Sequence, residues 1–136
     1  MRRAGWLVAA VVLLTGCGAD AAPMPDWVAN RNPLATCGVE ELGADLAYDE
    51  RARTCLMNAY LAGRGAELIT HQITDEGDPI TGYVRVHENG VVELFVDATR
   101  DRAGSGSWER WGCEALTHEE GSRVFVPDGC QRLPVP

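Results

Sequence analysis

The stretch from Tyr83 to Val96, YVRVHENGVVELFV, decides the fold because it predicts a β-hairpin whose register can be worked out. A two-residue loop at Asn89-Gly90 would mix apolar and charged residues on both faces of the hairpin. A three-residue loop, Glu88-Asn89-Gly90, with Gly90 left-handed in a bulge, separates them, because a slip of one residue moves every side chain to the other face. One face then carries Val84, Val86, Val92, Leu94 and Val96, and the other carries Tyr83, Arg85, Glu93 and Phe95.

A helical pattern precedes this hairpin, and alternating patterns lie on both sides of it. Asp49 can cap a helix that Gly63 ends, with an apolar stripe made of Ala52, Cys55, Leu56, Ala59 and Tyr60. Candidate strands cover residues 67–74, 80–87, 91–98, 108–117 and 123–126. The predicted fold class is α+β, with one main helix packed on an antiparallel β-meander of four to five strands.

The folded domain is expected to cover residues 37–136. Residues 18–36 contain three prolines and no apolar period, which is typical of a tether. Val39, Leu42 and Leu46 follow a helical spacing that predicts a short helix or turn, although Gly38 and Gly43 disfavour a helix there.

The first 16 residues have the pattern of a signal peptide. Arg2 and Arg3 precede an apolar run at residues 6–14, which is too short to span a bilayer core that needs about 20 residues. Leu14-Thr15-Gly16-Cys17 then resembles the lipobox of bacterial lipoproteins, and the lysine-free composition is similar to that of small actinobacterial lipoproteins of unknown function. The resemblance implies that Cys17 carries a diacylglycerol and becomes the new N-terminus. The alternative is a chance cysteine after an ordinary signal peptide.

Four cysteines remain after Cys17, and an even number in an exported chain indicates two disulfides. Three pairings are open. The pairs Cys37–Cys55 and Cys113–Cys130 are favoured because each bridges neighbouring elements and closes a short loop. A zinc site is disfavoured because no Cys-x-x-Cys pair occurs in the sequence.

The charge of the chain excludes one class of partner. The formal charge of −8 becomes −10 when Arg2 and Arg3 are removed with the signal peptide. Such a surface repels phosphate backbones, so nucleic acid is not an expected partner.

The candidate binding surface is the sheet face that carries the aromatic residues of the hairpin. If the valine face of the hairpin packs on the helix, the opposite face presents Tyr83, Phe95, Trp108 and Leu116 to a partner. The alternative is that the tether or the final segment covers this face and forms a second small core.

No catalytic residues, cofactor or metal ligands are predicted. His71, His87 and His118 share no metal-ligand spacing and accompany no nucleophile motif. Asp97, Thr99 and Asp101 have the spacing of the first ligands of a calcium loop, but Arg102 stands where such a loop needs glycine. These acids are therefore interpreted as turn-capping residues, and the alternative is a weak calcium site made jointly with Asp75 or Asp78.

The sequence predicts a lipoprotein of the extracytoplasmic face of the cell membrane, anchored through Cys17, that acts as a non-enzymatic binding module. Its partner is expected to be an envelope protein or a cell-wall component. The alternative is a small envelope hydrolase that uses a histidine and a carboxylate. A pocket holding His71 or His87 beside a carboxylate would favour the enzyme, and a sheet with bare aromatic residues would favour binding.

Overall fold

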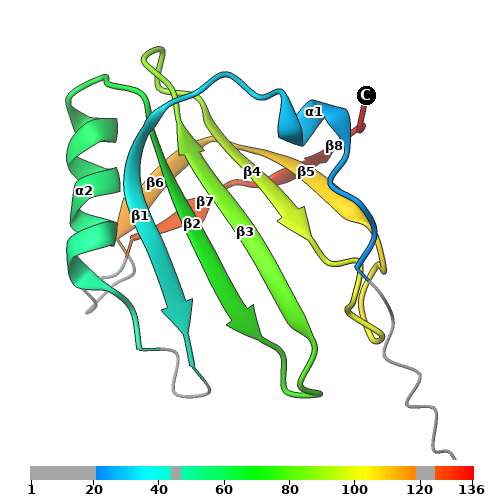
Figure 1. Ribbon diagram of the computed structural model, residues 1–136. Coiled ribbons are helices and arrows are strands. Elements are labelled where there is room, and N and C mark those ends of the chain that lie inside the picture. Colours follow the sequence, from blue (N-terminus) through cyan, green and yellow to red (C-terminus); the bar gives the residue numbers. More distant parts are fainter. Residues whose placement is uncertain (1–20, 44–46, 119–124) are drawn as a thin grey trace, which may run out of the picture.

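The computed structural model describes residues 21–43, 47–118 and 125–136. A six-stranded sheet forms the centre of the domain, with one long helix against one face and a short helix near the other (Figure 1). The helices are α1 (Asp26–Ala29) and α2 (Glu50–Leu61). The strands are β1 (Ala35–Leu42), β2 (Ala66–Ile73), β3 (Pro79–Val86), β4 (Val92–Asp97), β5 (Trp108–Cys113), β6 (Ala115–His118), β7 (Phe125–Asp128) and β8 (Gln131–Leu133).

The α+β fold class and its single main helix are confirmed. The main sheet has the order β1-β2-β3-β4-β5-β8 and is antiparallel except for the pair β1 and β2, and a second sheet contains β6 and β7. In the described part of the chain, neither helix is long and apolar enough to cross a membrane.

Helix α2 begins and ends where its capping residues predict. Asp49 Oδ1 accepts hydrogen bonds from the backbone N–H groups of Arg51 and Ala52 at 2.9 and 3.1 Å, and Gly63 adopts φ +61° after the last turn. The buried face of α2 packs on apolar residues of the sheet and of β6, and this core contains Ala52, Leu56, Met57, Ala59, Ala66, Leu68, Val84, Val86, Val92 and Leu116. The expectation that Cys55 lies on this buried stripe is wrong, since Cys55 is exposed at its edge.

The predicted hairpin register is confirmed between β3 and β4. Val86 pairs with Val92 and Tyr83 pairs with Phe95. The His87 N–H donates to the Val91 carbonyl at 2.9 Å, and Gly90 closes the loop with φ +81° and an N–H bond to the His87 carbonyl. The loop therefore has three residues, as the separation of apolar and charged faces requires.

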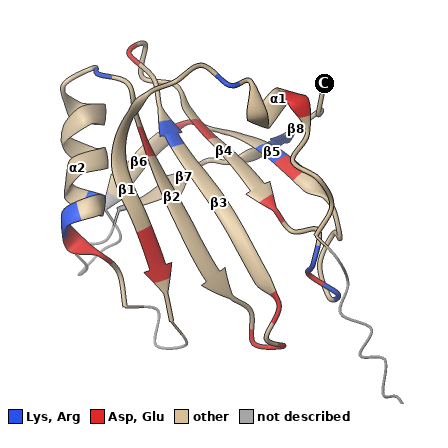
Figure 2. Ribbon diagram, in the orientation of Figure 1, with Lys and Arg blue, Asp and Glu red and all other residues tan. Residues whose placement is uncertain are grey.

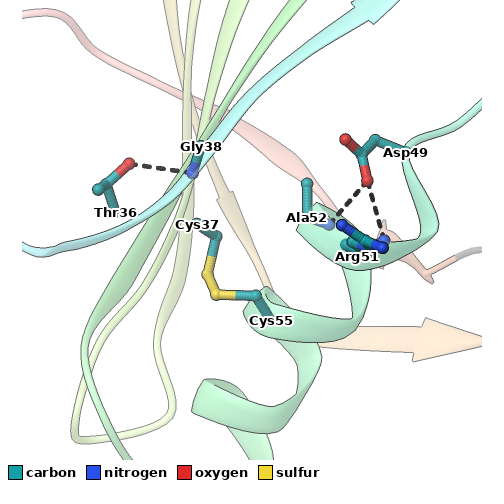
Figure 3. Close-up of a disulfide and its surroundings, with 7 residues drawn as sticks. All are labelled: Thr36, Cys37, Gly38, Asp49, Arg51, Ala52 and Cys55. Atoms are coloured by element: carbon teal, nitrogen blue, oxygen red, sulfur yellow. Dashed lines mark hydrogen bonds between the residues drawn. A yellow bond between two sulfur atoms is a disulfide. The ribbon is translucent and has the colours of Figure 1, made fainter.

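The expectation of a short helix or turn at Val39 and Leu42 is wrong, because both residues lie in strand β1. Leu46 lies outside the described residues. The strand runs parallel to β2, and an irregularity between Thr36 and Val39 inserts an extra residue at Gly38, which has φ +101°. Because of this bulge, Cys37 and Glu40 both reach α2 although they are three residues apart. Cys37 forms a disulfide with Cys55, confirming that predicted pair (Figure 3), and Glu40 binds Arg53.

The predicted strand at residues 108–117 divides at Glu114 into β5 and β6. Strand β5 pairs with β4 and β8 in the main sheet, whereas β6 leaves it to pair with β7. The predicted Cys113–Cys130 disulfide is confirmed and joins the end of β5 to the segment between β7 and β8. The second half of the predicted strand at 123–126 lies in β7, and residues 123 and 124 lie outside the described residues.

Candidate functional site

The sheet face opposite α2 is covered at one end by helix α1. The expectation that the tether extends to residue 36 is wrong, because residues 26–29 form α1 and residues 35 and 36 begin β1. Val28 is fully buried, and the Trp27 ring meets Phe95 edge-on with centroids 5.1 Å apart. Tyr83 stacks against Trp108 at 6.2 Å in the same cluster. The described part of the tether therefore closes a second core.

The expected exposed patch of Tyr83, Phe95, Trp108 and Leu116 is wrong, and the alternative of a second small core is correct. Tyr83 and Phe95 are 7 % and 4 % exposed, and Trp108 is half-buried beside them. Leu116 is buried on β6 in the other core, under α2. The physical reason is that α1 supplies apolar side chains, so the aromatic face is removed from water.

A row of ion pairs crosses the same face beside α1. Acidic and basic residues alternate on neighbouring strands (Figure 2). Arg31 makes two hydrogen bonds to Glu67, both at 2.8 Å, and Arg85 Nε donates to the same carboxylate at 2.9 Å. Arg110 donates twice to Glu93 at 2.7 and 2.8 Å, and Arg85 Nη1 lies 3.5 Å from Glu93. We call these five residues the ionic row.

The ionic row holds the chain that follows α1 against the sheet. Burial raises the pKa of the Glu67 carboxyl, but the hydrogen bonds and charges of Arg31 and Arg85 lower it more, so the net pKa is below its usual value. The hydrogen bond to Glu67 raises the pKa of Arg31. The Arg31 guanidinium also lies over the Tyr83 ring, 4.7 Å from its centroid.

His87 lies beside the ionic row and contacts one of its members. Its Nε2 lies 3.3 Å from Oε2 of Glu93, a carboxylate that already binds Arg110. In the described contacts, His87 is therefore a further hydrogen-bonding neighbour of the Glu93 carboxylate. The side chain of His118 is outside the described part of the structure.

The other end of the same sheet face is open and carries a second set of polar side chains. In the register of β1, β2 and β3, Glu41 pairs with His71 and His71 pairs with Thr81. Residues that pair directly on adjacent strands share a face, with Cβ atoms about 5 Å apart. Nδ1 of His71 lies 2.7 Å from Oε1 of Glu41. The His71 side chain is 45 % exposed, so the ring stays accessible to a ligand.

A pocket of about 320 Å³ lies at this end of the sheet. It brings Glu41, His71 and Thr81 together with Arg100 from the loop between β4 and β5; the other lining residues are Leu42, Gln72, Ile73, Pro79 and Ile80. The sequence singled out His71 alone among these residues. Glu41 and Arg100 were missed because their place beside His71 depends on the parallel pairing of β1 and on the course of a long loop.

The acidic loops make turn contacts of the kind predicted for them. Asp97 Oδ1 accepts hydrogen bonds from the N–H and hydroxyl groups of Thr99 at 3.0 and 2.7 Å, and Asp101 Oδ1 accepts from the N–H of Gly104 at 2.8 Å. Asp78 binds the backbone and side chain of Arg102, which lowers the pKa of its carboxyl. Within the described ranges, no group of three or more His, Cys, Asp or Glu residues is arranged to hold a metal ion.

Three comparisons with known proteins found no match for this chain. No protein-family model matches it, and neither a curated protein nor a solved structure does so.

Proposed function

We propose that the protein is a membrane-anchored, extracytoplasmic binding domain. Two disulfides support this proposal, because such bonds form and persist in oxidising compartments outside the cytoplasm. The anchor would be lipidated Cys17, which lies outside the described residues and is proposed from its lipobox-like sequence. The proposed partner is an envelope protein or a cell-wall component.

The proposed binding surface is the open end of the sheet face, which we call the open face and define by Val39, His71, Ile73 and Thr81. Val39 and Ile73 are 50 % and 53 % exposed, although valine and isoleucine are among the residues most often buried in folded proteins. Ile73 follows His71 by two residues on β2, and Val39 lies on the neighbouring strand β1, so both share the face of the His71 ring. This combination of exposed apolar side chains and a polar centre on one sheet face is the observation that carries the proposal.

The anchor is tested by replacing Cys17 with serine. Acylation requires the thiol, so Cys17→Ser should release the protein from the membrane fraction or leave its signal peptide uncleaved. Fractionation of cells, followed by mass determination of the wild-type N-terminus, measures both effects. A processed Cys17→Ser variant that stays in the membrane fraction would contradict the anchor.

The surface is tested separately by placing a photo-reactive amino acid at Ile73 in intact cells. The same amino acid at Leu61, which is 74 % exposed at the end of α2, is the matched control for an exposed apolar position. Binding through the open face predicts a discrete cross-linked product from position 73 and none from position 61. Equal cross-linking from both positions would reject the open face as the binding surface.

A further inference from the structure

We propose that the pocket beside His71 is an esterase site, in which His71 is the general base, Glu41 orients it and Arg100 binds an anionic group of the substrate. This activity belongs to the hydrolase alternative, which a pocket holding His71 beside a carboxylate favours. It goes beyond the proposed binding role and needs neither the lipid anchor nor a macromolecular partner. It can therefore succeed or fail independently of that role.

The argument begins with the orientation of the His71 ring. A carboxylate can only accept hydrogen bonds, so the contact of 2.7 Å assigns the hydrogen to Nδ1 of the neutral ring and leaves a lone pair on Nε2. In the described part of the chain, Nε2 of His71 has no partner. A carboxylate that holds one ring nitrogen while the other faces a substrate is the arrangement of an oriented general base.

His87 provides an internal contrast to His71. It also lies beside a carboxylate, but its contact with Glu93 is made through Nε2 and lies next to the buried Arg85 and the Arg110 ion pair. The lining of the pocket contains His71 and not His87. Both histidines have a carboxylate neighbour, so the open Nε2 and the pocket distinguish His71.

Arg100 supplies the second functional group of the site. It is exposed, and the described residues offer it no ion pair or hydrogen bond, whereas Arg102 in the same loop is paired with Asp78. A guanidinium with free donors matches the geometry of a carboxylate or phosphate group. The pocket therefore favours a substrate that carries an anionic group.

The size and lining of the pocket limit the remainder of the substrate. A volume of about 320 Å³ is small for a ligand site, since such sites range from about 300 to 1,000 Å³. Apolar side chains line it beside the polar ones, namely Leu42, Ile73, Pro79 and Ile80. A short acyl chain ending in a carboxylate fits this volume, this lining and the charge of Arg100.

The proposed step is the hydrolysis of an ester to a carboxylic acid and an alcohol. Nε2 of His71 accepts a proton from a water molecule while the water oxygen bonds to the carbonyl carbon of the ester. The tetrahedral intermediate then collapses and the bond from carbon to the alcohol oxygen breaks. The imidazolium returns its proton to the leaving oxygen. Glu41 remains ionised and accepts the Nδ1–H bond throughout, so it is a positioning residue.

The experiment compares two chromogenic esters of similar size on the purified full chain. One is the mono-4-nitrophenyl ester of glutaric acid, which carries a carboxylate, and the other is neutral 4-nitrophenyl butyrate. The variants are His71→Gln and Arg100→Gln. Their matched controls are His87→Gln and Arg64→Gln, because Arg64 is exposed beside α2 and lines a different pocket. Thermal melts show whether each variant is folded.

The proposal predicts a different kinetic effect for each residue. His71→Gln should lower kcat for both esters by about 100-fold, which is within the usual contribution of a general base. Arg100→Gln should raise KM for the anionic ester by about tenfold and leave the neutral ester unchanged, because it removes a charged hydrogen bond. The two control variants should retain wild-type kinetics.

Two results would overturn the proposal. The first is a wild-type rate no higher than that of free imidazole at the same concentration. The second is equal loss of activity in His71→Gln and His87→Gln, which would assign the rate to exposed imidazole groups in general. Loss of activity on Glu41→Gln with unchanged KM would support the positioning role, and full activity of that variant would remove Glu41 from the site.

Discussion

Replacing Val28 with alanine is expected to destabilise the domain although Val28 lies in a helix of four residues. Val28 is fully buried between α1 and the aromatic face of the sheet. The substitution removes two buried carbon atoms at about 0.8 kcal/mol each, and the cavity left behind adds to this loss. We therefore expect the free energy of unfolding to fall by about 2 kcal/mol, which lowers the Tm by roughly 8 °C in a domain of this size.

The assay for Val28→Ala is urea denaturation of the purified chain without residues 1–17, with both disulfides formed. Met24→Ala is the control, because Met24 lies just before α1 and is exposed. Its free energy of unfolding should stay within about 0.5 kcal/mol of the wild type. If Val28→Ala also changed the free energy of unfolding by no more than about 0.5 kcal/mol, the docking of α1 would be refuted. Tyr83 and Phe95 would then have to be exposed.

Three further predictions concern the loop, the ionic row and the second disulfide. Gly90→Val should cost over about 1 kcal/mol in a thermal melt because a β-branched side chain fits φ +81° poorly, whereas Gly90→Asn should cost less. The pKa of Glu67 is lower in the folded than in the unfolded chain. The ionised Glu67 therefore stabilises the fold above its unfolded pKa of about 4.3, and this stabilisation is lost as the pH falls through the folded pKa. Urea melts from pH 7 to pH 3 should therefore show a smaller loss for Glu67→Gln than for the wild type, and equal losses would contradict the pairing with Arg31. Replacing Cys113 and Cys130 with alanine should cost roughly 3 kcal/mol, and a non-reduced peptide map that links either residue elsewhere would reject the pair.

The hairpin and α2 could be predicted because their signals are local. Asp49 and Gly63 mark the ends of the helix by capping chemistry, and Gly90 fixes the loop that sets the register. The disulfide between Cys37 and Cys55 also followed from closeness along the chain. Each of these inferences needs only residues that are near one another in sequence.

Strand β1 could not be predicted because its bulge breaks the alternation of side chains. The extra residue at Gly38 puts Cys37 and Glu40 on one face although they are three apart. The exposed Val39 and the buried Leu42 lie on opposite faces after the bulge, but their spacing of three imitates a helix. The covering of the aromatic face was also hidden. Helix α1 has too few residues to show a period, and Val28 is its single buried residue.

The candidate site was missed for a related reason. His71 was recognised as a histidine within a strand, but Glu41 reaches it only through the parallel pairing of β1 and β2. Parallel pairing joins segments that are distant in sequence and leaves no turn signal between them. Arg100 enters the pocket from a loop whose course no local pattern fixes.

The bulge at Gly38 also affects how the domain meets other extended chains. Strand β1 is an edge of the main sheet, and a long flat edge invites an incoming strand to add to it and begin aggregation. The extra residue puts the two halves of β1 out of step, so a regular strand can match its hydrogen-bonding groups on one side of the bulge only. The uninterrupted segment that remains is residues 39–42, which is shorter than the usual strand of about five to six residues. The irregularity that turns Cys37 and Glu40 toward α2 thus also makes this edge a poor template for β-aggregation.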